Sequence, residues 1–270
     1  MRRSLGLLMP LCKLCKLDRE LRESHFLPAA IYAQLRENSQ QNPNPVSMTS
    51  RVSLTTSRQI TGRVLCAECE ERFSRLGETW VLANMARPEG FTIQEALVAA
   101  KPIAANENFA YYSSAAVAAI NMDALVYFAM SMFWRASAQT WRNVSGFMEG
   151  IDLGPFEEAI RRFLLGDKFP ADTVILVSVW PTRDVLPAAY TPRRGRAPGY
   201  HCFNFLIPGL EFKLLTGRQI PEDLRAMCSH ASPDRLIFSA MSVVSDTMES
   251  FTKLASTSRV SKNLQEVAKR

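Results

Sequence analysis

Two short cysteine motifs constrain the fold of this chain more than any other feature. They are Cys12-Lys13-Leu14-Cys15 and Cys66-Ala67-Glu68-Cys69. Two such pairs offer four thiolates, the usual ligand set of a structural zinc ion, which has no open coordination position and therefore organises a fold without performing chemistry. We expect Cys12, Cys15, Cys66 and Cys69 to bind one Zn²⁺ ion.

A disulfide framework is the alternative use of these cysteines. The chain has 270 residues, enough to bury a core of its own without covalent staples. In an intracellular protein, paired C-x-x-C motifs indicate metal sites. The other two cysteines, Cys202 and Cys228, stand alone. Cys202 alternates with Phe203 and Phe205 in a strand-like run, which predicts an inert buried thiol.

The two pairs differ in their local context. Cys12 and Cys15 lie between an apolar run and a charged stretch, which is typical of a turn. Residues 66–85 have apolar side chains at close to helical spacing, so the second pair should lie in the first turn of a helix. The partial positive charge of a helix N-terminus favours thiolates. A knuckle turn and a helix that share one zinc make a treble clef, which we expect within residues 1–88.

Between the pairs lies Ser24-His25-Phe26-Leu27-Pro28. The order Cys-x-x-Cys, Ser-His-x-x-Pro, Leu-Cys-x-x-Cys-Glu resembles the zinc-stabilised branch of the HNH endonucleases, and also a set of uncharacterised bacterial proteins with the same module. The resemblance covers roughly the first third of the chain. It implies a ββα-metal fold, a bacterial protein, and hydrolysis of DNA or RNA with a second divalent metal such as Mg²⁺.

The family's functional positions transfer only in part. The family's general base matches His25, while the acidic metal ligand before it is replaced by Ser24, a poor ligand. No Asn stands near Thr61, where the family has one, and on the helix only Glu70 or Glu71 can bind a hard cation. The resemblance therefore implies His25 as the base and Glu70 as a metal ligand of the catalytic site.

His25 also has structural interpretations: it could cap the following helix, bond a main-chain carbonyl or replace one cysteine on zinc. The function prediction therefore has two forms. One is a zinc-binding, HNH-like, metal-dependent nuclease. The other is a catalytically inactive zinc module joined to an α+β sensing or protein-interaction domain, where His25 and the helix N-terminus recognise a phosphate or a protein partner.

The predicted fold class is α+β. Within the zinc module we expect a helix over 28–37, a polar insert over 38–58 that is a long loop or a mobile segment, and a strand near 59–65. Residues 89–270 should form a domain of helices followed by a small antiparallel sheet. Its predicted helices cover 121–138, 155–165, 221–227 and 246–269, and its predicted strands cover 173–180, 200–207, 210–215 and 235–241.

Two arginine features need an interpretation. The cluster Arg193-Arg194-Gly195-Arg196 lies in a Pro/Gly-rich segment over 187–199, which predicts an exposed loop that either touches phosphate or is simply solvated. Arg135 ends the apolar helix over 121–138. It could bind a buried anion, but capping of helix carbonyls or pairing with a carboxylate is the favoured interpretation.

Composition and charge distinguish only weakly between possible partners and locations of the protein. The formal net charge of +6 favours polyanions modestly. The apolar stretches 5–11 and 124–134 are too short for a signal peptide and a membrane span. We expect a cytoplasmic protein without a membrane partner. The sequence has no phosphate-binding glycine loop, dinucleotide fingerprint or Ser-His-Asp pattern.

Overall fold

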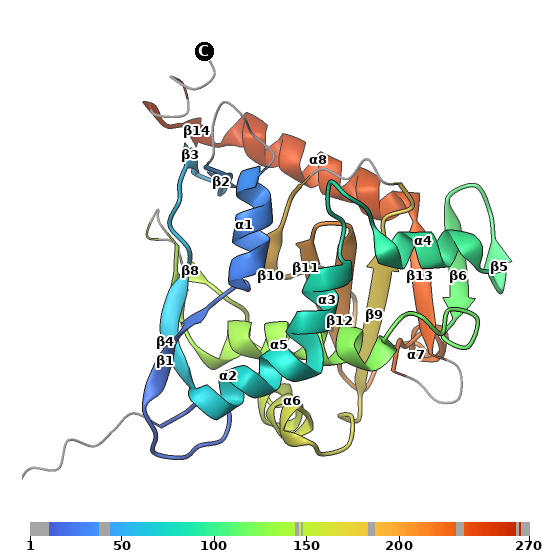
Figure 1. The fold of residues 1–270 in the computed structure, drawn as a ribbon, viewed down its shortest axis with the longest axis horizontal. Coiled ribbons are helices and arrows are strands. Elements are labelled where there is room, and N and C mark those ends of the chain that lie inside the picture. The colour runs from blue at the N-terminus through green and yellow to red at the C-terminus, as the bar shows by residue number, and fades with distance from the viewer. Residues whose placement is uncertain are drawn as a thin grey trace, which may run out of the picture.

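The computed structural model describes residues 11–37, 44–143, 146, 148–182, 187–230, 235–262 and 265. Within these ranges the chain has mixed α and β structure, consistent with the predicted α+β class. A two-stranded ribbon and its helices lie beside a larger sheet, and one long helix runs between the two parts (Figure 1).

The part that carries the cysteines is built around the antiparallel ribbon of β1 (Leu21–His25) and β4 (Thr61–Cys66). Helix α1 (Ala29–Glu37) follows β1, and α2 (Ala67–Phe73) follows β4 without an intervening loop. The helix continues through a π turn, η1 (Ser74–Glu78), into α3 (Thr79–Asn84). The predicted helices over 28–37 and 66–85 and the strand near 59–65 are confirmed.

The polar insert is ordered where the structure describes it. Strands β2 (Val46–Met48) and β3 (Val52–Thr55) form a hairpin, and β14 (Arg259–Val260) pairs with β3 in parallel. The prediction of a long loop is therefore wrong for residues 46–48 and 52–55, which are strands, while residues 38–43 lie outside the described ranges. The strand β3 is stabilised by a partner from the other end of the chain, which local composition does not reveal.

The large sheet has seven strands among the described residues, in the order β10-β11-β12-β9-β13-β6-β5. Neighbouring strands are antiparallel except β9 and β13, which are parallel. The prediction of a small antiparallel sheet is therefore wrong in size and in one pairing. The strands are β5 (Ala104–Ala105), β6 (Phe109–Ser113), β9 (Thr173–Val179), β10 (Tyr190–Arg194), β11 (His201–Ile207), β12 (Leu210–Thr216) and β13 (Leu236–Ala240).

Helix α5 (Met122–Ala138) is the centre of the molecule. Asn121 caps its start by accepting a hydrogen bond from the Ala124 amide (2.9 Å), and almost every side chain along it is buried. It packs against β9, β10 and β12 on one side, and against α2, η1 and α6 (Phe156–Leu165) on the other. A helix that is apolar all round can be stable only in such a position. One continuous core therefore runs through both parts of the chain.

The remaining elements lie around this core. Helix α4 (Thr92–Ala99) and the short α7 (Glu222–Ala226) flank the large sheet, and β7 (Trp141–Arg142) pairs with β8 (Met148–Glu149). Helix α8 (Met241–Thr257) crosses from β13 to β14 (Figure 1). It begins before the predicted 246 and ends before the predicted 269. In the described part of the chain, no helix has both the length and the apolar character needed to cross a bilayer.

Candidate metal centre

The first cysteine pair lies in a tight knuckle. Leu11 and Asp18 form an antiparallel bridge, and the Lys16 amide donates to the Cys12 carbonyl (2.9 Å). Lys16 has a φ of 62°, the left-handed conformation that reverses the chain immediately after Cys15. The Lys13 amide also donates to the carbonyl of Val64 in β4 (3.0 Å). These bonds fix the predicted turn against the ribbon that leads to the second pair.

The second pair lies where β4 meets α2. Cys66 is the N-cap residue of α2 and Cys69 lies in its first turn, as predicted. The four sulfur atoms lie within 4.8 Å of one another, and Cys15 Sγ and Cys66 Sγ are 3.9 Å apart. A tetrahedral zinc site with bonds of ~2.3 Å requires sulfurs separated by about 3.8 Å. All four cysteines are free thiols, so this cluster can hold a metal ion such as zinc.

The surroundings of the sulfur atoms shift the pKa values of the cysteines in opposite directions. Burial opposes ionisation of Cys12, but hydrogen bonds from the amides of Cys15, Cys66 and Leu14 lower its pKa. Burial raises the pKa of Cys66 and, with the neighbouring thiols, that of Cys69. Without a cation, those two thiols therefore keep their protons. A divalent ion would displace them, since a coordinating thiol is deprotonated.

Arg19 was not singled out by the sequence pattern, yet it lies at the edge of the cysteine cluster. Its Nη1 atom is 3.9 Å from Cys66 Sγ and 2.8 Å from the carboxylate of Glu68. Four thiolates around one Zn²⁺ ion carry a net charge of −2, which a nearby guanidinium partly offsets. The only sequence signal was position, because Arg19 follows directly after the knuckle.

The structure brings together some of the residues that the family resemblance implies. The buried Ser24 hydroxyl donates a hydrogen bond to Oε1 of Glu70 on α2, while Glu71 is exposed. The His25 side chain is directed to the opposite face of β1, because successive side chains of a strand alternate. No hydrogen bond of its ring is found among the described residues, and His25 is not part of the metal cluster. Its role as a base, and that of Glu70 as a metal ligand, stay predictions.

Arg135 links α5 to η1 and to the end of β1 through polar contacts. Its side chain is 2% exposed, and it donates to Oε1 of Glu78 (2.8 Å) and to the main-chain oxygens of His25 (2.9 Å) and Phe26 (3.5 Å). The guanidinium also lies over the Phe73 ring, 5.3 Å from its centre. The favoured interpretation, pairing with a carboxylate, is confirmed. The partner could not be found from the sequence, because Glu78 reaches Arg135 from the π turn.

The arginine cluster is only partly a loop. Arg193 and Arg194 lie on β10, at the edge of the large sheet, so the loop prediction is wrong for these two residues. The Arg194 guanidinium lies 3.0 Å from Nδ1 of His201, and the Arg193 guanidinium stacks over the Tyr190 ring at 4.0 Å. Strand geometry therefore sends these two cations in different directions. Contact with nucleic acid stays a prediction.

These features define a class: a mixed α/β protein with a four-cysteine centre that can hold a metal ion between a knuckle, a ribbon and a helix. Comparisons of the chain with family models, with curated proteins and with solved structures gave no match.

Proposed function

We propose that the four cysteines bind a structural Zn²⁺ ion and that residues 11–73 form a treble clef of the HNH type. The order of the elements supports this proposal. A knuckle with two ligands is followed by the β1–β4 ribbon and by a helix whose first turn carries the other two ligands. The centre stabilises the first part of the chain, about residues 1–88, against the domain over 89–270.

The module acts as a scaffold for recognition and not as a nuclease. One observation carries this choice. The Ser24 hydroxyl donates a hydrogen bond to the Glu70 carboxylate, the group that would have to bind the catalytic metal, while the His25 side chain is directed to the other face of the strand. Metal-dependent hydrolysis needs a base and a cation on the same phosphate.

Zinc content and thermal stability test the metal assignment. The wild-type protein should contain one zinc per chain. Cys66→Ser should lose the metal and unfold at a lower temperature, because structural zinc contributes on the order of 10 kcal/mol to a small module. Cys202→Ser is the matched control, since Cys202 lies on β11, away from the cluster. Unchanged zinc content and stability in Cys66→Ser would contradict the treble clef.

A nuclease is the second candidate, favoured by the order of the elements: β1, which carries His25, pairs with β4, and β4 leads directly into α2, which carries Glu70. Plasmid, single-stranded DNA and RNA should be incubated with zinc-loaded protein and Mg²⁺, Mn²⁺ or Ni²⁺. The scaffold proposal expects no cleavage. Cleavage that requires the added metal and disappears in His25→Ala, with zinc retained and His201→Ala still active, would overturn the scaffold and establish the nuclease.

A further inference from the structure

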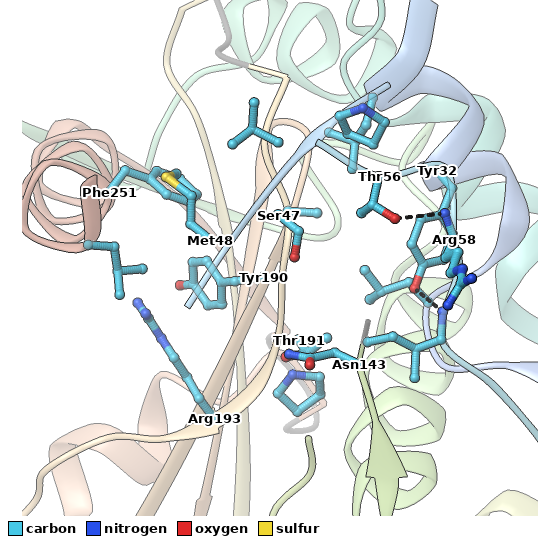
Figure 2. A pocket seen from close by; sticks show the side chains of 18 of the residues that line it. Tyr32, Ser47, Met48, Thr56, Arg58, Asn143, Tyr190, Thr191, Arg193 and Phe251 are labelled. Atoms are coloured by element: carbon cyan, nitrogen blue, oxygen red, sulfur yellow. Dashed lines mark hydrogen bonds between the residues drawn. The ribbon is translucent and has the colours of Figure 1, made fainter. Parts of the chain in front are cut away.

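A cavity of about 430 Å³ lies between the insert, α1, β10 and α8. Its volume falls in the range of small-molecule sites, roughly 300–1,000 Å³. Figure 2 shows the side chains that surround it. The residues used below are Ser47 and Met48 from β2, Arg58 from the segment before β4, Tyr190 and Arg193 from β10, and Phe251 from α8.

The lining carries positive charge without compensating negative charge. Two arginines, Arg58 and Arg193, lie on opposite sides of the cavity (Figure 2). Among the described lining residues there is no Asp or Glu, and within the described ranges neither arginine makes an ion pair with a carboxylate. The nearby Glu211, which bonds the Tyr190 hydroxyl, is ion-paired with Lys213 (3.2 Å). The cavity is therefore suited to an anion.

Arg193 is held in position before any ligand arrives. Its guanidinium stacks on the Tyr190 ring, and the Tyr190 hydroxyl donates to Glu211 (2.9 Å) and accepts from Asn204 (3.1 Å). Stacking on an aromatic ring whose hydroxyl is fixed restricts both side chains. A guanidinium ordered in this way loses little entropy on binding and can offer a paired donor edge to a phosphate or carboxylate.

The rest of the wall is suited to a flat apolar group. Phe251 and Met48 both line the cavity, and the Ser47 hydroxyl lies among the side chains that face its centre (Figure 2). Aromatic and methionine side chains pack against planar groups, and one hydroxyl supplies an orienting hydrogen bond. The lining thus combines an anion anchor with an apolar surface.

We propose that this cavity binds a small organic anion, about the size of a mononucleotide, that carries one phosphate or carboxylate and one flat apolar part. Arg193 anchors the acidic group, Phe251 and Met48 contact the flat part, and Arg58 attracts the ligand from the opposite wall. The lining contains none of the four metal-centre cysteines, so the inference does not depend on the zinc assignment.

Two fluorescent probes test the proposal on the full-length protein. 1-Anilinonaphthalene-8-sulfonate is a flat anion, and N-phenyl-1-naphthylamine is its uncharged analogue. The anionic dye should bind at one site and more tightly than the uncharged dye. Arg193→Gln should weaken the anionic dye about tenfold, the value of one charge-assisted contact, and leave the uncharged dye unchanged. Phe251→Ala should weaken both. Arg194→Gln, which removes the adjacent charge on β10, is the control.

Competition then identifies the acidic group. If AMP displaces the anionic dye while adenosine and inorganic phosphate do not, the acidic group of the ligand is a phosphate. Displacement by 1-naphthoate, with AMP ineffective, indicates a carboxylate. The proposal would be overturned if the two dyes bound with equal affinity, or if Arg193→Gln and Arg194→Gln weakened the anionic dye equally. It would also be overturned if Arg193→Gln and Arg58→Gln both kept full affinity for the anionic dye, or if neither AMP nor 1-naphthoate displaced it.

Discussion

Arg135 and Glu78 form an ion pair of 2.8 Å, and the same guanidinium holds the main-chain oxygen of His25 at 2.9 Å. One side chain of the central helix thus binds both η1 and β1. Since α5 also packs against the large sheet, the part with the four-cysteine cluster and the sheet are joined through a buried cation. Any change at this pair is expected to affect both parts together.

The first prediction concerns this ion pair. Glu78→Gln leaves the Arg135 cation buried without its carboxylate, and breaking a buried pair from one side costs about 3 kcal/mol. We expect a loss of that order in the free energy of unfolding, measured with urea. Glu71→Gln changes the same charge at an exposed position of α2 and should stay within about 0.5 kcal/mol of the wild type. Equal losses in the two variants would contradict the coupling role.

The second prediction concerns the contact between η1 and α5. A methyl group at Gly77 would lie 2.9 Å from the main-chain nitrogen of Phe128, and a main chain cannot move aside as a side chain can. Gly77→Ala should therefore lower the free energy of unfolding by about 1–3 kcal/mol. Ser74→Ala alters an exposed side chain of the same π turn and serves as the control. A neutral Gly77→Ala would mean that the two helices are not in close contact.

The third prediction is a pH dependence due to His230. Burial and the nearby Arg235 lower the pKa of this histidine, against a smaller opposing effect of Asp123, and its ring stacks on Phe169 at 4.2 Å. The unfolded chain therefore binds a proton more readily than the folded one. The contribution of His230 to stability is present above the unfolded pKa of about 6.5 and decreases as the pH falls below it.

Urea unfolding of the wild type and His230→Gln between pH 5 and 8 measures this effect. The free energy of unfolding of the wild type, minus that of His230→Gln, should decrease as the pH falls, because the glutamine does not titrate. Other titrating groups affect both proteins equally and cancel in the difference. Parallel stability curves across this range would show that His230 titrates alike in both states.

The fourth prediction concerns the pairing of β14 with β3. The amides of Arg259 and Ser261 donate to the carbonyls of Arg51 and Ser53 (2.9 Å each). Ser261→Pro removes one of these donors and should raise hydrogen–deuterium exchange in peptides that cover 46–55. The Val260 amide points away from β3 in such a parallel ladder, so Val260→Pro should have a much smaller effect. Similar exchange in the two variants would mean that this pairing does not order the insert.

Local patterns in the sequence predicted the elements that depend on near neighbours. The spacing of the cysteines predicted the four-cysteine cluster, and the apolar run after Asn121 predicted α5, because ligand spacing and helix burial are properties of short segments. The strands over 200–207 and 210–215, which pair as β11 and β12, were predicted for the same reason.

Pairings between distant segments could not be predicted in this way. Strand β3 is polar and short, and its partner β14 comes from the other end of the chain; the Ser53 and Ser258 hydroxyls that meet there are 205 positions apart. The parallel contact of β9 with β13 likewise depends on the whole sheet. The cavity is the extreme case, since its walls come from five separate stretches of the chain, and a pattern in one of them, such as the arginine cluster at Arg193, does not reveal the other four.

The cavity also has a consequence for how the protein is made. Its walls include Tyr32 from α1, near one end of the chain, and Phe251 and Leu254 from α8, near the other. A nascent chain emerging from the ribosome therefore has no complete cavity until α8 has left the exit tunnel. The four cysteines of the cluster, by contrast, have all been made once Cys69 has joined the chain. The four cysteines can thus be brought together during translation, whereas the cavity cannot be complete before α8 has been made.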